Sequence, residues 1–162
     1  MRARDFKGSW DRGQKLEESF FELVKLRDPN ARKATKSEQY KHIDFFTSFG
    51  SIDVKSKKRR NRADGHEQDT IVWLEYKNVI GRAGWLTSNV DILAFERDDD
   101  FILVLRKDLL RLANRICDLT DMVDDSYKAL YKGYTRKGRQ DLLTQVKMKD
   151  IMLLNNRVWR KI

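Results

Sequence analysis

The sequence predicts one α/β or α+β domain in which helices flank a central mixed β-sheet. Apolar residues recur with helical spacing near both ends of the chain, and between about residues 42 and 106 they alternate with the two-residue period of strands. The 162 residues are enough for one core, 40% of them are hydrophobic, and only one is proline. Because no long linker interrupts the pattern, residues 1–162 are expected to form a single domain.

The first predicted element is a helix that starts at Ser9 or Asp11, either of which suits a cap, and ends near Leu26 before Asp28-Pro29. Its apolar residues have the spacing of one helical face and are Leu16, Phe20, Leu23 and Val24. At about 100° per residue, Glu17 falls on that apolar face. Its carboxyl group is therefore expected to point inward.

The middle of the chain predicts a sheet, which follows a polar segment over 30–41 that is a loop or a short helical piece. Gly50 turns the chain between the first two strands, which alternate apolar and polar residues and form a hairpin. A polar excursion over 57–69 separates them from the third strand. The predicted strands span 42–49, 51–57, 70–79, 90–96 and 101–106.

The C-terminal part returns to helical spacing from Lys107, until acidic residues over 118–125 interrupt the pattern. Residues 127–139 interleave tyrosines with basic residues. The remaining pattern predicts a late strand over 142–146 and a final amphipathic helix over 149–159.

The chain carries 34 lysines and arginines against 25 aspartates and glutamates, a formal net charge of +9. Such a composition favours an anionic partner, most often nucleic acid and less often an anionic membrane surface. The single cysteine, Cys117, excludes an intramolecular disulfide and a cysteine-based zinc site, and it favours a reducing compartment.

The longest apolar run, over 101–105, is too short to cross a bilayer, and residues 1–10 lack the apolar stretch of a signal peptide. We therefore expect a cytoplasmic protein, in the host cytoplasm if the source is viral. Secretion and a membrane partner are not expected.

Two acid-x-lysine units stand on neighbouring predicted strands, Asp53-Val54-Lys55 and Glu75-Tyr76-Lys77. Residues two apart in a strand share a face, so each unit places a carboxylate beside an ammonium group. If the two strands pair, both carboxylates converge, and a cation such as Mg²⁺ or Mn²⁺ would hold them together. A metal there can polarise a phosphodiester while a lysine orients water or stabilises developing charge. The alternative is a solvated polar face, because so short a motif also occurs by chance.

Basic residues gather in two stretches that suit phosphate binding. The first follows the Asp53 unit and comprises Lys55, Lys57, Lys58, Arg59, Arg60 and Arg62. The second lies among tyrosines, whose rings could add base stacking, and comprises Arg136, Lys137 and Arg139. The alternatives are a solvated turn for the first stretch and partly buried helix residues for the tyrosines.

These residues resemble the PD-(D/E)XK nuclease superfamily, which includes Holliday-junction resolvases and a phage junction-resolving endonuclease. Gly13-Gln-Lys-Leu-Glu17 resembles the helix glutamate of the family, Ile52-Asp53 its PD acid with isoleucine in place of proline, and Glu75-Tyr-Lys77 its E-x-K unit. The stretch from His42 to Asp91 is also similar to small nuclease-like proteins of tailed phages. The resemblance implies a restriction-endonuclease-like core over about 10–110 and a C-terminal extension over about 119–162.

The resemblance also implies a role for each residue of the site. Asp53 and Glu75 would bind Mg²⁺ or Mn²⁺, with the Tyr76 carbonyl completing the site. Lys77 would position or activate water, and Glu17 would bind a second ion or orient a water molecule.

A second assignment stays open within the same resemblance. Asp44 and Asp53-Val-Lys55 could instead be the PD acid and the (D/E)-x-K unit, both on the first hairpin. We prefer Asp53 with Glu75 and Lys77, because this choice leaves residues 42–49 as the first strand of the family. Asp44 and Lys55 are then supporting residues or alternative ligands, and Asp91 is a further candidate.

The expected function is that of a Mg²⁺-dependent endodeoxyribonuclease, which hydrolyses phosphodiester bonds in duplex or branched DNA and needs no small-molecule cofactor. A two-fold symmetric junction needs two cuts, so a branched substrate would imply a homodimer. One alternative is a non-catalytic, basic nucleic-acid-binding or packaging protein. Another is a nuclease that acts on RNA.

Overall fold

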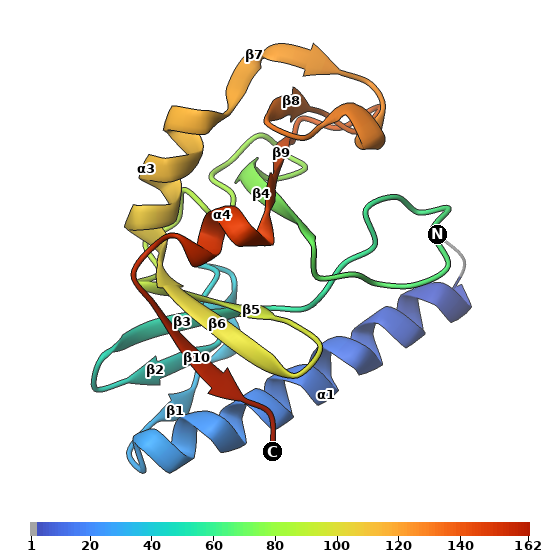
Figure 1. Ribbon diagram of the computed structural model, residues 1–162. Coiled ribbons are helices and arrows are strands. Elements are labelled where there is room, and N and C mark those ends of the chain that lie inside the picture. Colours follow the sequence, from blue (N-terminus) through green and yellow to red (C-terminus); the bar gives the residue numbers. More distant parts are fainter. Residues whose placement is uncertain (1–2) are drawn as a thin grey trace.

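Helices and strands follow one another along the chain as Figure 1 shows. The structure is a computed structural model that describes the backbone of residues 3–162 and the side chains of residues 12–162. The helices are α1 (Ala3–Arg27), α2 (Lys36–Gln39), α3 (Arg106–Ile116), α4 (Met148–Met152) and the 3₁₀ helix η1 (Ser126–Lys128). The strands are β1 (Arg32–Lys33), β2 (Phe45–Thr47), β3 (Gly50–Lys55), β4 (Ile71–Lys77), β5 (Ile92–Glu96), β6 (Asp100–Leu105), β7 (Asp118–Val123), β8 (Lys132–Tyr134), β9 (Leu142–Lys147) and β10 (Asn156–Arg160).

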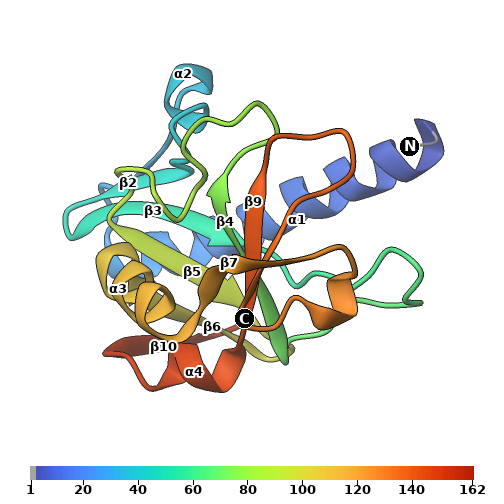
Figure 2. The same cartoon turned by 90° about the horizontal axis from the view of Figure 1, so that it is seen from above.

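The strands form two mixed sheets, where the sequence predicted one. The first has the order β1-β2-β3-β5-β6-β10 and the second the order β4-β9-β8-β7. Each contains one parallel pair, β3 with β5 and β7 with β8. Helices flank the sheets (Figure 2), so the predicted α/β class with mixed sheets is confirmed. No helix within residues 3–162 is long and apolar enough to span a bilayer.

Both faces of the first sheet are covered. On β6, Phe101 and Leu103 are buried in the core beneath α1, while Ile102 and Val104 belong to a second core on the other face. That second core also contains apolar residues of α3, α4, β4 and β9. The two-residue period of the strand therefore supplies two cores at once, and the molecule is built in layers.

The helix α1 crosses the first sheet with its predicted apolar face inward. Phe20 is fully buried, and its ring lies 4.9 Å from that of Phe101 and 5.6 Å from that of Trp159. The helix begins at Ala3, before the predicted caps Ser9 and Asp11, so that start was wrong. Serine and aspartate are tolerated inside a helix at a cost below about 1 kcal/mol, so neither residue has to begin one.

The predicted hairpin is confirmed as β2 and β3, although β2 starts three residues later than expected. After β3 the chain leaves the first sheet to form β4, and it returns as β5, parallel to β3. Gly50 begins β3 at φ 137°, where a side chain would be strained and would meet Asp91 at 3.1 Å.

The prediction of a final helix over 149–159 was wrong. A short helix, α4, ends at Met152, and β10 then pairs antiparallel with β6 along the edge of the first sheet. Pairing with β10 satisfies the backbone N–H and carbonyl groups along the otherwise open edge of β6. This gain outweighs the helical pattern of so short a segment. The late strand predicted over 142–146 is confirmed as β9, whereas β7 and β8 were not predicted.

The expected division into a core over 10–110 and an extension over 119–162 has no counterpart in the sheets. The strand β10 completes the first sheet, and β4 has its partner in β9. Each of the two sheets therefore combines strands from both parts of the chain.

Candidate active site and basic cleft

Two aspartates face each other across the β2–β3 hairpin. The pairing of Phe45 with Ile52 places Asp44, one residue before β2, opposite Asp53. The Asp44 backbone N–H donates to the Ile52 carbonyl at 2.8 Å, and the Val54 N–H donates to Asp44 Oδ2 at 2.8 Å. The hairpin backbone thus holds the Asp44 carboxyl group beside that of Asp53.

Lys55 forms an ion pair with Asp53 from two residues along the same strand. Its Nζ lies 3.0 Å from Asp53 Oδ2 and 4.7 Å from the centroid of the Trp85 ring. Asp53 is 4% exposed, and its Oδ2 receives no well-formed hydrogen bond from the described residues. The Lys55 ammonium group is the cation that compensates the charge of this buried carboxylate.

Glu17 joins the cluster from α1, as its predicted place on the inner face requires. Burial, the Asp44 charge and a hydrogen bond to Asp44 raise the pKa of Glu17 to about 7. Burial and the Asp53 charge raise the pKa of Asp44 to about 7. Burial also raises the pKa of Asp53, against the opposing effect of Lys55. Three interacting acids and one lysine therefore come together from α1 and the hairpin.

The loop that carries Trp85 is fixed by a buried arginine. Arg106, at the start of α3, donates through Nε to the Val90 carbonyl at 2.8 Å and through Nη1 to the Leu86 carbonyl at 3.1 Å. In the same loop, a Cβ on Gly84 would lie 2.4 Å from the Glu75 carbonyl oxygen, so only glycine fits. These contacts fix the loop from which the Trp85 ring meets the Lys55 ammonium group.

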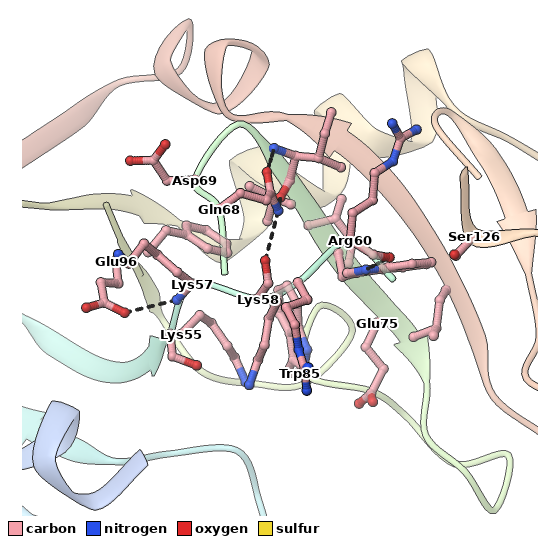
Figure 3. A pocket seen from close by; sticks show the side chains of 18 of the residues that line it. Lys55, Lys57, Lys58, Arg60, Gln68, Asp69, Glu75, Trp85, Glu96 and Ser126 are labelled. Carbon is pink, nitrogen blue, oxygen red and sulfur yellow. Dashed lines mark hydrogen bonds between the residues drawn. The ribbon is translucent and has the colours of Figure 1, made fainter. Parts of the chain in front are cut away.

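A cleft of about 950 Å³ lies beside this cluster, lined by α1, β3, β4, β9 and their loops. Glu17 and Lys55 are among its lining residues. Figure 3 shows Lys55 and Lys57 on one side of the cleft, and Arg60, Glu75 and Ser126 on the other. All the residues predicted to contact nucleic acid line it: Lys55, Lys57, Lys58, Arg59, Arg60, Arg62, Arg136, Lys137 and Arg139. The fold thus joins two basic stretches that are far apart in the sequence.

Several of these cations already have partners within the protein. Lys57 pairs with Asp98 at 2.8 Å and Arg136 with Asp141 at 2.6 Å. The Arg60 guanidinium group donates to neighbouring oxygen atoms on two residues of the C-terminal part. Among the described residues, ion pairs are absent from Lys58, Arg62, Lys137 and Arg139. These four cations can contact phosphates without breaking an ion pair.

The structure does not bring Glu75, Lys77 and Asp53 together. The two strands do not pair, because β3 pairs with β2 and β5 while β4 pairs with β9, so the condition for the carboxylates of Asp53 and Glu75 to converge is not met. Glu75 lines the cleft from the second sheet, and Lys77 is exposed at the end of β4.

The carbonyl of Tyr76 and the side chain of Asp91 have structural roles. The carbonyl accepts hydrogen bonds from the Gly84 N–H at 2.9 Å and from Thr87 Oγ1 at 2.7 Å. Asp91 Oδ2 accepts from the N–H of Ser51 at 2.9 Å and from its hydroxyl group at 3.1 Å. These bonds occupy the proposed ligand atoms and connect β4 and β3 to the loop over 78–91.

The residues fit a divalent cation through two carboxylates. Among residues 12–162, no group of three or more His, Cys, Asp or Glu side chains is arranged so that it could hold a metal ion. Mg²⁺, however, is commonly held by one or two carboxylates together with water and substrate phosphates. Asp44 and Asp53 supply such a pair, and Asp53 Oδ2 faces the Lys55 ammonium group at 3.0 Å.

Comparison of the chain with models of protein families, with curated proteins and with solved structures gives no match.

Replacing Asp44 with asparagine is expected to stabilise the metal-free protein at pH 8. An acid whose pKa is raised on folding destabilises the folded protein as the pH rises from the pKa of the unfolded chain, near 4, to the pKa of the folded protein, about 7. Asparagine has no such charge and can still accept from the Val54 N–H. Thermal melting in EDTA at pH 5.5 and pH 8 measures this, with about 2–4 °C in Tm for each 1 kcal/mol.

The same variant tests the cation. Mg²⁺ should raise the Tm of the wild type more than that of Asp44→Asn, because binding relieves repulsion that only the wild type has. If both proteins show the same pH dependence and the same response to Mg²⁺, Asp44 is not part of a charged cluster.

Proposed function

We propose that the protein is a metal-dependent nuclease that hydrolyses phosphodiester bonds of DNA bound in the basic cleft. The observation that carries this proposal is the convergence of Glu17, Asp44, Asp53 and Lys55 beside a cleft lined by nine lysines and arginines. Basic residues alone would suit any anionic partner. The carboxylates and the lysine add the groups that phosphodiester hydrolysis requires.

Each residue of the cluster has a distinct task in this proposal. Asp44 and Asp53 would hold Mg²⁺ or Mn²⁺, which when bound polarises the phosphodiester and lowers the pKa of an attacking water molecule. Lys55 Nζ would orient that water and stabilise negative charge that develops on the phosphate oxygens. Glu17 would accept a hydrogen bond from a water molecule. Trp85 keeps the Lys55 ammonium group close to Asp53.

Of the two assignments within the resemblance to PD-(D/E)XK nucleases, the arrangement of the hairpin supports the one that uses Asp44 and Asp53-Val-Lys55. The helix α1 with its inward glutamate precedes the β2–β3 hairpin, Asp44 directly precedes β2, and Asp53-Val-Lys55 lies on β3. We therefore propose Asp44 as the PD acid and Asp53-Val-Lys55 as the (D/E)-x-K unit of a restriction-endonuclease-like core. Glu75 and Lys77 are not part of this proposed set.

The proposal is tested by cleavage of labelled linear duplex, single strand, flap, four-way junction and RNA, each with Mg²⁺, Mn²⁺ or EDTA. We expect wild-type protein to cut at least one of these substrates with a divalent ion and none in EDTA. Asp53→Asn, which keeps the shape of the side chain, should bind the same substrate without cutting it. Metal-independent cleavage, or equal cleavage by Asp53→Asn, would contradict the assignment.

A second candidate function is non-catalytic binding or packaging of nucleic acid. It is favoured by one observation, namely that residues 12–162 contain no ready-made group of three metal-ligating side chains. This function predicts binding by both proteins and cleavage by neither, with any metal, so the same experiment separates the two candidates.

A further inference from the structure

The loop over 56–70, between β3 and β4, forms a fixed wall of the cleft because the C-terminal part of the chain holds it. Arg60 donates through Nε to Gln145 Oε1 at 3.2 Å and through Nη2 to the Tyr127 carbonyl at 3.0 Å. Trp73 Nε1 donates to the Arg60 carbonyl at 3.2 Å, and the Tyr127 hydroxyl donates to Asp64. A ligand therefore meets a preformed wall, not a loop that must first be ordered.

Aromatic rings line the same cleft. Trp73 of β4 and Tyr134 of β8 are both half-buried, and their ring centroids lie 5.3 Å apart at an interplanar angle of 48°. Trp85 lines the cleft as well, next to Lys55. Each ring is held by a neighbour, so presenting it to a ligand costs little side-chain entropy.

Stacking of this kind is open to a base only when the base is unpaired. In a duplex the faces of the bases are covered by their neighbours, and a protein reaches the backbone and the base edges in the grooves. A single strand exposes the faces, and a basic groove with aromatic rings is the usual way in which proteins bind it. The cleft is also lined by Lys58 and Arg62, which precede Trp73 in the sequence, and by Lys137 and Arg139, which follow Tyr134. These four cations can bind the phosphates of the strand.

We propose that the ligand of the cleft is an unpaired polynucleotide strand, whose bases stack on Trp73 and Tyr134 while the four cations hold its phosphates. This inference rests on the proposed function and specifies that its substrate is unpaired where it enters the cleft. The strand could be single-stranded DNA, RNA, or an unpaired arm of a branched molecule, all of which share exposed base faces. A continuous duplex lacks them.

Binding without cleavage tests this proposal in the Asp53→Asn background. Fluorescence anisotropy would compare three labelled probes of equal length: single-stranded DNA, the same sequence as a duplex, and single-stranded RNA. We expect at least one single strand to bind about tenfold more tightly than the duplex. Adding Tyr134→Ala should weaken single-strand binding about tenfold, as for the loss of one stacked base, and should leave duplex binding unchanged.

Two matched variants separate stacking from general damage. Tyr134→Phe keeps the ring and should bind single strands like its parent. Tyr40→Ala removes a ring that is 79% exposed and outside the cleft, so it should also have no effect.

The proposal is overturned if the duplex binds as tightly as both single strands, or if Tyr134→Ala weakens all probes equally. Metal-dependent cutting of a duplex by the wild type would then leave the nuclease assignment in place. If no probe binds, both the strand preference and the proposed function fail.

Discussion

Lys55→Met is expected to reduce metal-dependent cleavage by about 10²–10³-fold in kcat, with little change in nucleic-acid binding. A preorganised cation that stabilises transition-state charge typically contributes this much. The ammonium group lies 3.0 Å from Asp53 Oδ2, whereas eight other basic residues of the cleft remain to hold the substrate. Methionine keeps an apolar stem beside Trp85, so the change removes charge more than packing. Single-turnover cleavage measures the change in rate, and a parallel binding assay measures the change in affinity.

The matched control is Lys77→Met. This residue stands in the other acid-x-lysine unit, at the exposed end of β4, and should retain wild-type cleavage. Loss of cleavage in Lys77→Met with retention in Lys55→Met would return the active site to Glu75 and Lys77 and refute the cluster on the hairpin.

Arg106→Ala is expected to lower the free energy of unfolding by about 2–6 kcal/mol. Arg106 is 7% exposed and donates to the carbonyls of Val90 and Leu86. Leaving a buried acceptor unsatisfied costs about 1–3 kcal/mol, and here there are two. Urea unfolding at constant m-value measures the change. Because the same loop holds Trp85 against Lys55, we also expect slower cleavage under conditions where the variant is fully folded.

Arg111→Ala provides the comparison on the same helix. Its side chain is exposed on α3, so the change in stability should stay within about 0.5 kcal/mol. Equal effects of the two substitutions would show that the buried hydrogen bonds of Arg106 contribute nothing specific.

Local patterns in the sequence were sufficient to predict the hairpin and the inward position of Glu17. Each depends on residues that are close in the chain, the alternation around Gly50 and the helical stripe of Phe20 and Val24. The choice between Glu75 and Asp44 as the partner of Asp53 depended on which strands pair, and β4 pairs with β9, about seventy residues later. Neither acid-x-lysine unit contains that information.

The C-terminal strand β10 also could not be predicted from local patterns. Apolar spacing at Ile151, Leu154 and Val158 suits a helix, but the open edge of β6 decides the conformation from outside the segment. Trp85 and Arg106 were likewise not predicted as site residues, because what they do depends on contacts with Lys55 and with two carbonyls. One local signal was present, because Gly81 and Gly84, just before Trp85, indicate a tight turn.

The position of β10 has a consequence for synthesis of the protein. Glu17, Asp44, Asp53 and Lys55 leave the ribosome before β10, which pairs with β6, places Trp159 against Phe20 and is the last strand of residues 3–162. Until residues 156–160 emerge, the nascent chain has an open sheet edge and an incompletely covered aromatic core, both of which favour aggregation and recognition by chaperones. The helix α1, which carries Glu17 of the proposed site, is therefore fully covered only after translation of these residues.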